Sequence, residues 1–251
     1  MTASRIERER AYWNEARASG EATRAAIAKY YAVAGRRLDA YGAALEPYAR
    51  RGAAMLELGC SDGATAVALA DRGGRVTGID ISDVAIRRAS ARASSAGVEA
   101  GFAVGDAAAL PFPDASFDVV YGSSVVHHVD IESVAAEAAR VTRPGGAAVF
   151  LEPLGINPLI RLYRRLTPAA RTVDERPLLA CDLAEICGRW RQVRIGWFDL
   201  ATLATVPLRG TPFFRHVLTA AQTIDDGLFS LLPSARRLAW FALIELADPV
   251  E

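Results

Sequence analysis

From residue 53 to residue 152, short apolar runs closed by Gly or Asp alternate with longer alanine-rich segments. Each run has the length and composition of a β-strand, and each intervening segment is long enough for a crossover helix. Repeated strand–helix units predict a parallel sheet with helices on both faces. The five runs are AAMLEL (53–58), RVTGID (75–80), GFAVG (101–105), FDVVYG (117–122) and AAVFLE (147–152).

The segments that flank these runs divide the chain into three parts. Residues 1–50 predict helices, because apolar residues recur there at roughly helical spacing. We expect them to form an N-terminal lid, with a ligand-binding core over 51–152. Residues 153–251 are expected to complete the sheet and to carry a cap. The Pro-Gly-Gly at 144–146 predicts a turn that ends one helix and begins the fifth strand.

The C-terminal part loses the regular alternation. Residues 157–168 and 181–190 predict short helices, and residues 192–200 and 238–248 predict strands. The interval 201–237 between these strands is longer than a turn and contains a helical pattern. We therefore expect it to be a helical insertion that caps the sheet and not a separate domain.

Charge and cysteine content narrow the class of protein. The chain of 251 residues has 29 Lys and Arg against 29 Asp and Glu, which argues against nucleic-acid binding through a basic face. Three cysteines without a CxxC spacing predict reduced thiols in the cytoplasm. The longest apolar stretch is too short for a bilayer, so we expect no membrane span.

The first strand runs into a loop of small residues that opens a helix. In this loop, Gly59 and Gly63 let a ligand approach the main chain, and the start of the helix favours an anionic or polar group. Asp80 closes the second strand, where a carboxylate accepts both hydroxyls of a ribose. These features predict a nucleoside-containing ligand at the carboxyl edge of the sheet.

One candidate ligand, a nicotinamide dinucleotide, fits the loop poorly. Its fold requires G-x-G-x-x-G, but Gly59, Ser61 and Ala64 keep only the first of those glycines. Lys29 is the single lysine and precedes the sheet, so the Tyr-x-x-x-Lys dyad of an oxidoreductase is impossible.

The order Glu57-x-Gly59-x-Ser61-x-Gly63 instead resembles the E/D-x-G-x-G-x-G loop of class I S-adenosylmethionine-dependent methyltransferases, with serine in place of the middle glycine. Later segments resemble further motifs of the small-molecule branch of that family, in the same order. The resemblance covers about residues 50–152. The later segments are GDA (105–107), LPFPDASFDVVYGSSVVHHV (110–129) and RVTRPGG (140–146).

This resemblance implies a Rossmann-like, doubly wound α/β fold. The sheet would have seven mainly parallel strands, helices on both faces, an antiparallel last strand and a helical cap. The implied cofactor is S-adenosyl-L-methionine, with Asp106 at the adenine amino group and Tyr31 over the methionine portion. The residues expected to bind it are Glu57, Gly59, Cys60, Ser61, Gly63, Asp80, Ile81, Asp106, Ala107, Ser123 and Tyr31.

Methyl transfer from a sulfonium is an in-line displacement that requires alignment and exclusion of water, and a hydroxyl acceptor benefits from a general base. His127 and His128 follow the fourth strand, and Glu152 ends the fifth at the same edge. Similarity to sugar and phenol O-methyltransferases favours His127 as the base, with Glu152 as its partner. His128 as the base, or a packing role for both histidines, stays open. We expect no metal, because these side chains form no ligand cluster in sequence.

The acceptor is less constrained. Aromatic residues of the cap predict a small molecule with apolar surface, unless the cap faces a second subunit in a homodimer. The charged segment 167–178 is either a solvated loop or a polar wall of the site. O-methylation is the leading hypothesis, and a methyltransferase-like protein that binds the cofactor without transferring methyl is the alternative. The aromatic residues are Trp197, Phe198, Phe213, Phe214 and Phe229.

Overall fold

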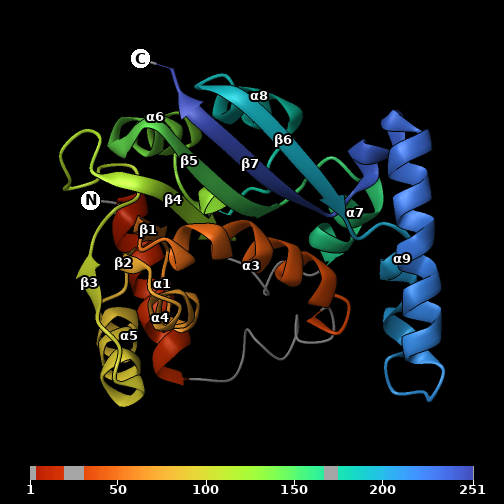
Figure 1. Ribbon diagram of the computed structural model, residues 1–251. Coiled ribbons are helices and arrows are strands. Elements are labelled where there is room, and N and C mark those ends of the chain that lie inside the picture. The colour runs from red at the N-terminus through yellow and green to blue at the C-terminus, as the bar shows by residue number, and fades with distance from the viewer. Residues whose placement is uncertain (1–3, 20–30, 167–174, 251) are drawn as a thin grey trace.

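The computed structural model of the protein describes residues 4–19, 31–166 and 175–250. Its strands are β1 (Ala54–Leu58), β2 (Arg75–Asp80), β3 (Ala100–Val104), β4 (Phe117–Ser123), β5 (Thr142–Pro153), β6 (Trp190–Phe198) and β7 (Phe241–Pro249). The described strands form one seven-stranded sheet in the order β3-β2-β1-β4-β5-β7-β6 (Figure 1). The first five pair in parallel, and β7 runs antiparallel to both β5 and β6. The predicted doubly wound sheet is confirmed.

Helices cover both faces of this sheet. Below it in Figure 1 lie α3 (Gly35–Arg50), α4 (Ala64–Asp71) and α5 (Asp83–Ala96), and above it lie α6 (Ile131–Val141) and α8 (Ala180–Cys187). None of the helices in the described ranges is long and apolar enough to cross a membrane. The remaining elements are α1 (Arg5–Ser19), α7 (Pro158–Leu166), α9 (Phe214–Leu231) and the 3-10 helices η1 (Val126–His128), η3 (Ala201–Leu208) and η4 (Pro233–Leu238).

Alternation along the buried strands divides the apolar core between the two faces. In β5, Ala147, Val149 and Leu151 pack on the face covered by α3 and α4. Ala148 and Phe150, one residue out of phase, pack on the face covered by α6 and α8. Residues 147–151 of the strand are therefore all apolar, as is typical of a strand buried on both faces.

The sequence predicted that residues 144–146 form a turn between a helix and the fifth strand, and this prediction was wrong in one respect. Residues 144–146 lie inside β5, which begins at Thr142 directly after α6 ends. The register against β4 jumps between the pairs Phe117–Thr142 and Val119–Ala147. The extra residues are accommodated as an irregularity of the strand, with Gly145 at a φ of 71° that glycine adopts without strain.

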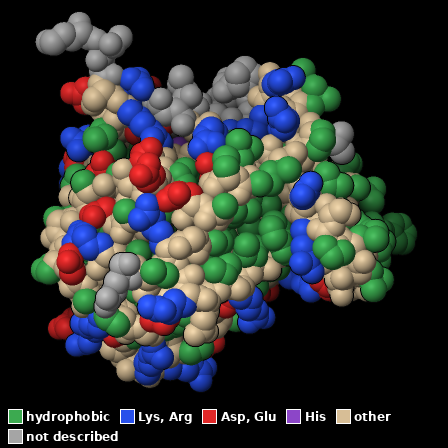
Figure 2. All heavy atoms as spheres, turned by 90° about the horizontal axis from the view of Figure 1, so that it is seen from above, with side chains coloured by type: hydrophobic (Ala, Val, Ile, Leu, Met, Phe, Trp, Pro, Cys, Tyr) green, Lys and Arg blue, Asp and Glu red, His purple; other side chains and the backbone are tan. Residues whose placement is uncertain are grey.

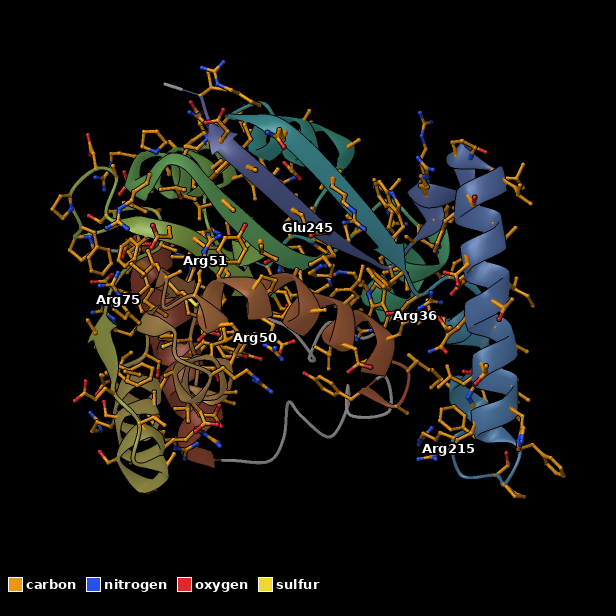
Figure 3. All side chains as sticks on the ribbon, in the orientation of Figure 1. Arg36, Arg50, Arg51, Arg75, Arg215 and Glu245 are labelled. Carbon is orange, nitrogen blue, oxygen red and sulfur yellow. The ribbon has the colours of Figure 1, made fainter. Side chains whose placement is uncertain are left out.

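A buried ion pair joins the N-terminal helices to the C-terminal part of the sheet. Arg37 of α3 pairs with Asp199, which follows β6, and both side chains are 5% exposed. The guanidinium carbon of Arg37 also lies 4.1 Å from the ring centroid of Phe241. Its neighbour Arg36 reaches toward α9 (Figure 3) and pairs with Asp226 at 2.8 Å. Helix α3 is therefore the link between the sheet and the inserted residues 201–238.

Substitution of Arg37 by methionine should lower the free energy of unfolding by about 3–5 kcal/mol, because it leaves the Asp199 carboxylate buried without its partner. Urea denaturation measures the loss, and the double variant Arg37→Met, Asp199→Asn should recover part of it. Arg50→Met, which breaks the exposed pair with Glu46, should leave stability unchanged. Equal stability of the Arg37→Met variant and the unaltered protein would contradict this role.

Candidate cofactor and active site

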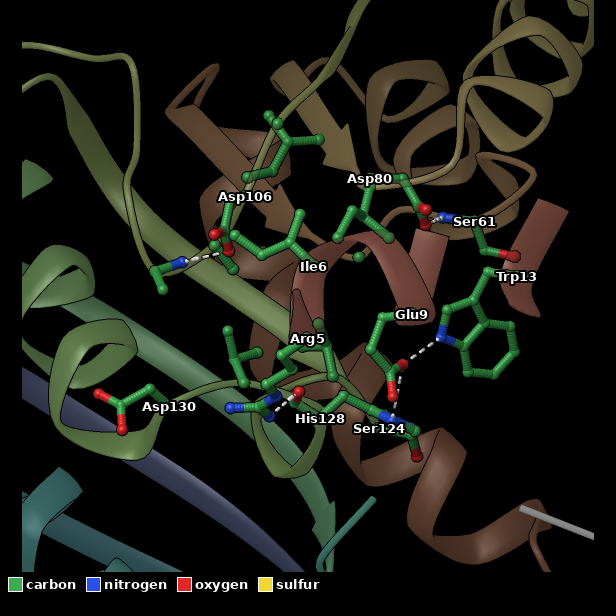
Figure 4. Close-up of a pocket in the computed structure, with 18 of the residues that line it drawn as sticks. Arg5, Ile6, Glu9, Trp13, Ser61, Asp80, Asp106, Ser124, His128 and Asp130 are labelled. Carbon is green, nitrogen blue, oxygen red and sulfur yellow. Dashed lines mark hydrogen bonds and ion pairs between the residues drawn. The ribbon is translucent and has the colours of Figure 1, made fainter. Parts of the chain in front are cut away.

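A cavity of about 470 Å³ lies at the carboxyl edge of β1 to β4 (Figure 4). It sits beside the point where the strand order reverses between β1 and β4, which is where open α/β sheets bind ligands. Residues that follow four different strands reach its wall. They include Gly59 and Ser61 after β1, Asp80 and Ile81 at β2, Asp106 and Ala107 after β3, and Ser123 at the end of β4.

The loop between β1 and α4 needs small residues for steric reasons. Gly59 has a φ of 64°, and a Cβ built on it would lie 2.6 Å from a methyl carbon of Val125. Gly63 has a φ of 75°, and a Cβ there would lie 2.8 Å from the Cβ of Ala89. Both glycines are required by the fold, and Gly59 in addition leaves main chain open to the cavity.

Two carboxylates at strand ends fix the loops of the cavity. Asp80 is 6% exposed and accepts hydrogen bonds from the backbone N–H groups of Ser61 and Ser82, each at 2.9 Å. Asp106 accepts one from the N–H of Ala108 at 2.9 Å. Both residues line the cavity, where a carboxylate can accept hydrogen bonds from hydroxyl or amino groups of a ligand.

Helix α1 forms part of the wall of the cavity. Ile6, Glu9 and Trp13 of this helix line the same cavity as Gly59 and Asp80 (Figure 4). Trp13 donates from its indole nitrogen to Glu9 at 2.9 Å, and its ring meets that of His128 edge to face at 5.4 Å.

Polar contacts hold α1 at both of its ends. Near its start, Arg5 donates to the backbone oxygen of His128. Near its end, Asn14 donates to Asp83 at 2.9 Å and accepts from the Ser82 hydroxyl at 2.6 Å. Helix α1 is therefore fixed against the residues that follow β2 and β4.

The lining of the cavity is rich in negative charge. Of the described residues that form it, four are acidic (Glu9, Asp80, Asp106 and Asp130), and Arg5 alone is basic. Such a surface attracts a ligand that carries positive charge and repels a pyrophosphate. The cavity therefore fits a cationic nucleoside better than a nicotinamide dinucleotide.

Glu152 and His127 form a buried pair beside this cavity. Oε2 of Glu152 lies 2.7 Å from Nδ1 of His127, and its Oε1 accepts the N–H groups of Val125 and Val126 at 2.9 Å each. Burial lowers the pKa of His127, the neighbouring His128 lowers it further, and Glu152 opposes both. At neutral pH the imidazole is therefore uncharged, with Nδ1–H directed at the carboxylate.

The second histidine points to the cavity instead. His128 lines it, and its Nδ1 lies 3.5 Å from Oε2 of Glu9 on the lid helix. The two imidazole rings are 4.2 Å apart. Both histidines thus stand at the predicted sheet edge, each with a carboxylate near its Nδ1.

A second, more polar cavity of about 510 Å³ adjoins the first, and His127 lines it. Among the described residues, Arg5, Val129 and Asp130 line both cavities. Arg176 forms part of its wall and pairs with Asp182 at 2.9 Å. His127 is therefore accessible from a space next to the cavity of the glycine loop.

The expectation that the histidines and acidic residues form no ligand cluster needs correction. Donor atoms of His127, His128 and Glu175 lie within 4.8 Å of one another. Glu175 belongs to the charged segment 167–178, which is distant in sequence from the histidines. The sequence left two alternatives for this segment, a solvated loop or a polar wall of the site. The Glu175 side chain is 14% exposed and pairs with Arg164 at 2.7 Å, so a metal ion would have to share its carboxylate with that arginine. Residues 167–174 of the segment lie outside the described residues.

Eight of the predicted residues line the first cavity, and His127 lines the second. Glu57, Cys60 and Gly63 lie outside both linings, and burial raises the pKa of Glu57 to about 8. Tyr31 is 59% exposed and also lies outside both linings. The eight are Gly59, Ser61, Asp80, Ile81, Asp106, Ala107, Ser123 and His128.

The sequence indicated Trp13 as an aromatic residue that could cover the cofactor, but it did not identify Arg5 and Glu9 of the same helix. Helix α1, RIERERAYWNEARAS, has charged residues on all sides and no apolar stripe that would mark a packing face. The cap aromatics, in contrast, line neither cavity. Phe229 is buried in the core and Phe213 is exposed.

Comparison with known proteins agrees with this geometry. A family model described as a methyltransferase domain matches residues 56–150. The 27-O-demethylrifamycin SV methyltransferase of Amycolatopsis mediterranei is 45% identical over 101 residues, which cover 39% of this chain and 37% of that protein. The chain thus spans little more than a third of that relative's length.

A second relative covers more of the chain. A probable S-adenosylmethionine-dependent methyltransferase of Mycolicibacterium smegmatis is 36% identical over 202 residues, or 73% of this chain and 76% of that protein. The structure of a putative sarcosine dimethylglycine methyltransferase from Galdieria sulphuraria has the same fold, with a TM-score of 0.59 at 18% identity over 85% of this chain and 86% of that one.

Fold and site together define a Rossmann-like domain that binds a nucleoside at the switch point of its sheet. The chain belongs to the family of S-adenosylmethionine-dependent methyltransferases. The predicted family and its cofactor, S-adenosylmethionine, are thereby confirmed.

Ser61, which stands where the family motif has its middle glycine, has a φ of 55°. A side chain in this left-handed conformation costs about 1–2 kcal/mol. We therefore expect Ser61→Gly to raise the free energy of unfolding by about 1 kcal/mol. Thermal and urea unfolding measure the change. The same substitution at the exposed Ser94 of α5 should instead lower stability, because glycine weakens a helix. A loss of stability in both variants would contradict the backbone strain that we infer at Ser61.

Proposed function

We propose that this chain transfers a methyl group from S-adenosylmethionine to an oxygen atom of a small molecule. The observation that carries the proposal is that a carboxylate-rich nucleoside cavity adjoins a buried His–Glu pair. A cationic methyl donor and a general base would then act at one sheet edge. The name of the rifamycin relative supports oxygen as the accepting atom.

The cofactor supplies, when bound, an electrophilic methyl group on a positively charged sulfur. In the proposal, Asp80 accepts hydrogen bonds from the ribose hydroxyls, and Asp106 accepts one from the adenine amino group. Gly59 leaves space for the ligand against the main chain. The acidic lining stabilises the positive charge, and α1 excludes water from the reacting groups.

His127 is the proposed general base. Its Nδ1 is engaged by Glu152, so Nε2 is the nitrogen that accepts the proton of the acceptor hydroxyl. Glu152 holds the ring in one orientation and stabilises the imidazolium after proton transfer. The lowered pKa keeps the base unprotonated near neutral pH, before the reaction.

The acceptor approaches His127 through the second cavity in this proposal. The ion pair of Arg176 and Asp182 in its wall favours a polar, hydroxylated group there. The apolar part of the acceptor, the homodimer, the cytoplasmic location and the absence of nucleic-acid binding stay predictions from the sequence. So does the division of the chain at residues 50 and 152.

Calorimetric titration tests the cofactor half. The unaltered protein should bind S-adenosylmethionine and S-adenosylhomocysteine, and Asp80→Asn should weaken both by about 10-fold to 100-fold, as loss of a charged acceptor predicts. Asp71→Asn, the same change at an exposed position of α4, should have no effect. Binding of NADH in place of the sulfur nucleosides would overturn the proposal.

The base is tested by release of S-adenosylhomocysteine with a panel of phenols and hydroquinones as acceptors. His127→Gln and Glu152→Gln should lower kcat by about 10²-fold to 10⁴-fold, while the affinity for S-adenosylmethionine changes little. The chain has 3 histidines, so NMR titration can follow each of them. The pKa of His127 should lie below the usual value and fall further in Glu152→Gln, because the carboxylate raises it.

His216→Gln, on the exposed side of α9, is the matched control and should keep full activity. Loss of activity in His128→Gln alone would move the role of base to His128. Normal cofactor binding without turnover of any acceptor would favour the non-transferring alternative.

A further inference from the structure

Helix α9 carries a row of large apolar side chains that the described chain leaves in solvent. Phe213, Val217, Ile224 and Leu231 follow one another at spacings of four, seven and seven residues, which puts them on one side of a helix. Leu231 is 80% exposed, Phe213 69% and Ile224 54%. Scattered apolar residues are ordinary on a surface, but an aligned row of them marks an interaction site. We call these four residues the α9 stripe.

The other sides of α9 attach it to the protein. Asp225 and Phe229 are buried, and Asp225 accepts hydrogen bonds from the start of η3, including one from the N–H of Ala201 at 2.6 Å. Arg36 of α3 donates to the backbone oxygen of Gln222 at 3.2 Å and pairs with Asp226 (Figure 3). These partners lie on the side of the helix opposite to the α9 stripe. The stripe therefore faces outward, at the edge of the molecule where α9 stands in Figure 1.

Positive charge stands at both ends of the α9 stripe. The exposed Arg209 precedes it, and Arg236 and the exposed Arg237 follow it in η4. Residues 201–238 contain four arginines and two aspartates. Both aspartates are already engaged, one with η3 and the other with α3. From above, basic and hydrophobic side chains adjoin one another on the α9 side, and acidic ones gather mainly on the other side (Figure 2).

Helix α7 also combines basic and apolar residues and has no acidic ones. Its exposed residues include two arginines and two leucines of the sequence PLIRLYRRL. The side chain of Asn157, which precedes α7, donates to the backbone oxygen of Leu238 at 2.7 Å, so α7 begins next to the end of η4. These exposed arginines and leucines are Arg161, Leu162, Arg165 and Leu166.

We propose that the α9 stripe and its flanking arginines dock on the surface of an anionic lipid bilayer. Large apolar side chains enter the boundary between headgroups and acyl chains, and arginines next to them reach the lipid phosphates. This surface binding does not depend on methyl transfer.

Charge distinguishes this partner from a second copy of the chain. A two-fold dimer brings the same patch of both subunits together. Because the α9 stripe has arginines at both ends, pairing of two copies in either direction would bring arginines together without acidic partners. An anionic bilayer neutralises them.

Co-sedimentation of the full chain with vesicles tests the proposal. The protein should bind phosphatidylcholine vesicles that contain phosphatidylglycerol much more strongly than vesicles of phosphatidylcholine alone. Ile224→Gln with Leu231→Gln should weaken binding by about 10-fold or more, because two apolar anchors are lost. Arg209→Gln with Arg237→Gln should weaken it by about 10-fold to 30-fold, at roughly 1 kcal/mol for each arginine near the surface.

Each double variant has a matched control. Thr219→Gln with Ser230→Gln changes two exposed positions on the polar side of α9, and Arg51→Gln with Arg75→Gln removes two exposed arginines at the other side of the molecule (Figure 3). Both controls should bind like the unaltered protein. Circular dichroism and titration with S-adenosylhomocysteine verify that all variants fold.

Failure of the unaltered protein to bind anionic vesicles would overturn the proposal. So would equal losses in the variants and their controls. A dimer in solution that Ile224→Gln with Leu231→Gln dissociates, without vesicle binding, would assign the α9 stripe to a second copy.

Discussion

The site depends on the contacts of one buried group, the carboxylate of Glu152. From the end of β5 it accepts two backbone N–H groups of the segment after β4 and contacts Nδ1 of His127. A carboxyl group that is 0% exposed needs such hydrogen-bond partners. The same three contacts fix the course of the chain between β4 and η1. Val125, held in this way, packs against Gly59 of the loop that forms the first cavity.

The first cavity is closed by a helix that has no apolar face. Helix α1 is held by hydrogen bonds to residues that follow β2 and β4, and its Glu9 adds to the negative charge of the lining. A lid that is held by polar contacts opens at a lower cost than one that buries a large apolar area. A cationic ligand adds contacts to both walls and so favours the closed arrangement.

Local pattern was enough to predict the sheet and the loop. Each strand from β1 to β5 had its own apolar run, because a strand buried on both faces needs apolar residues throughout. The positions of Gly59, Asp80 and Asp106 followed from that pattern, since the carboxyl ends of parallel strands share one edge. The turn at 144–146 was misplaced because a strand irregularity and a helix end use the same residues, Pro and Gly.

The sequence by itself therefore determined the α/β order, the family and the strand ends that carry Asp80, Asp106 and His127. Only the tertiary structure decided what meets these residues from far along the chain. Glu9 beside His128 and Glu175 near both histidines are examples. Such contacts join polar residues that lie in segments whose apolar residues show no regular spacing. Ion pairs and hydrogen bonds have no spacing rule in sequence, whereas burial of apolar surface imposes one on every strand and helix.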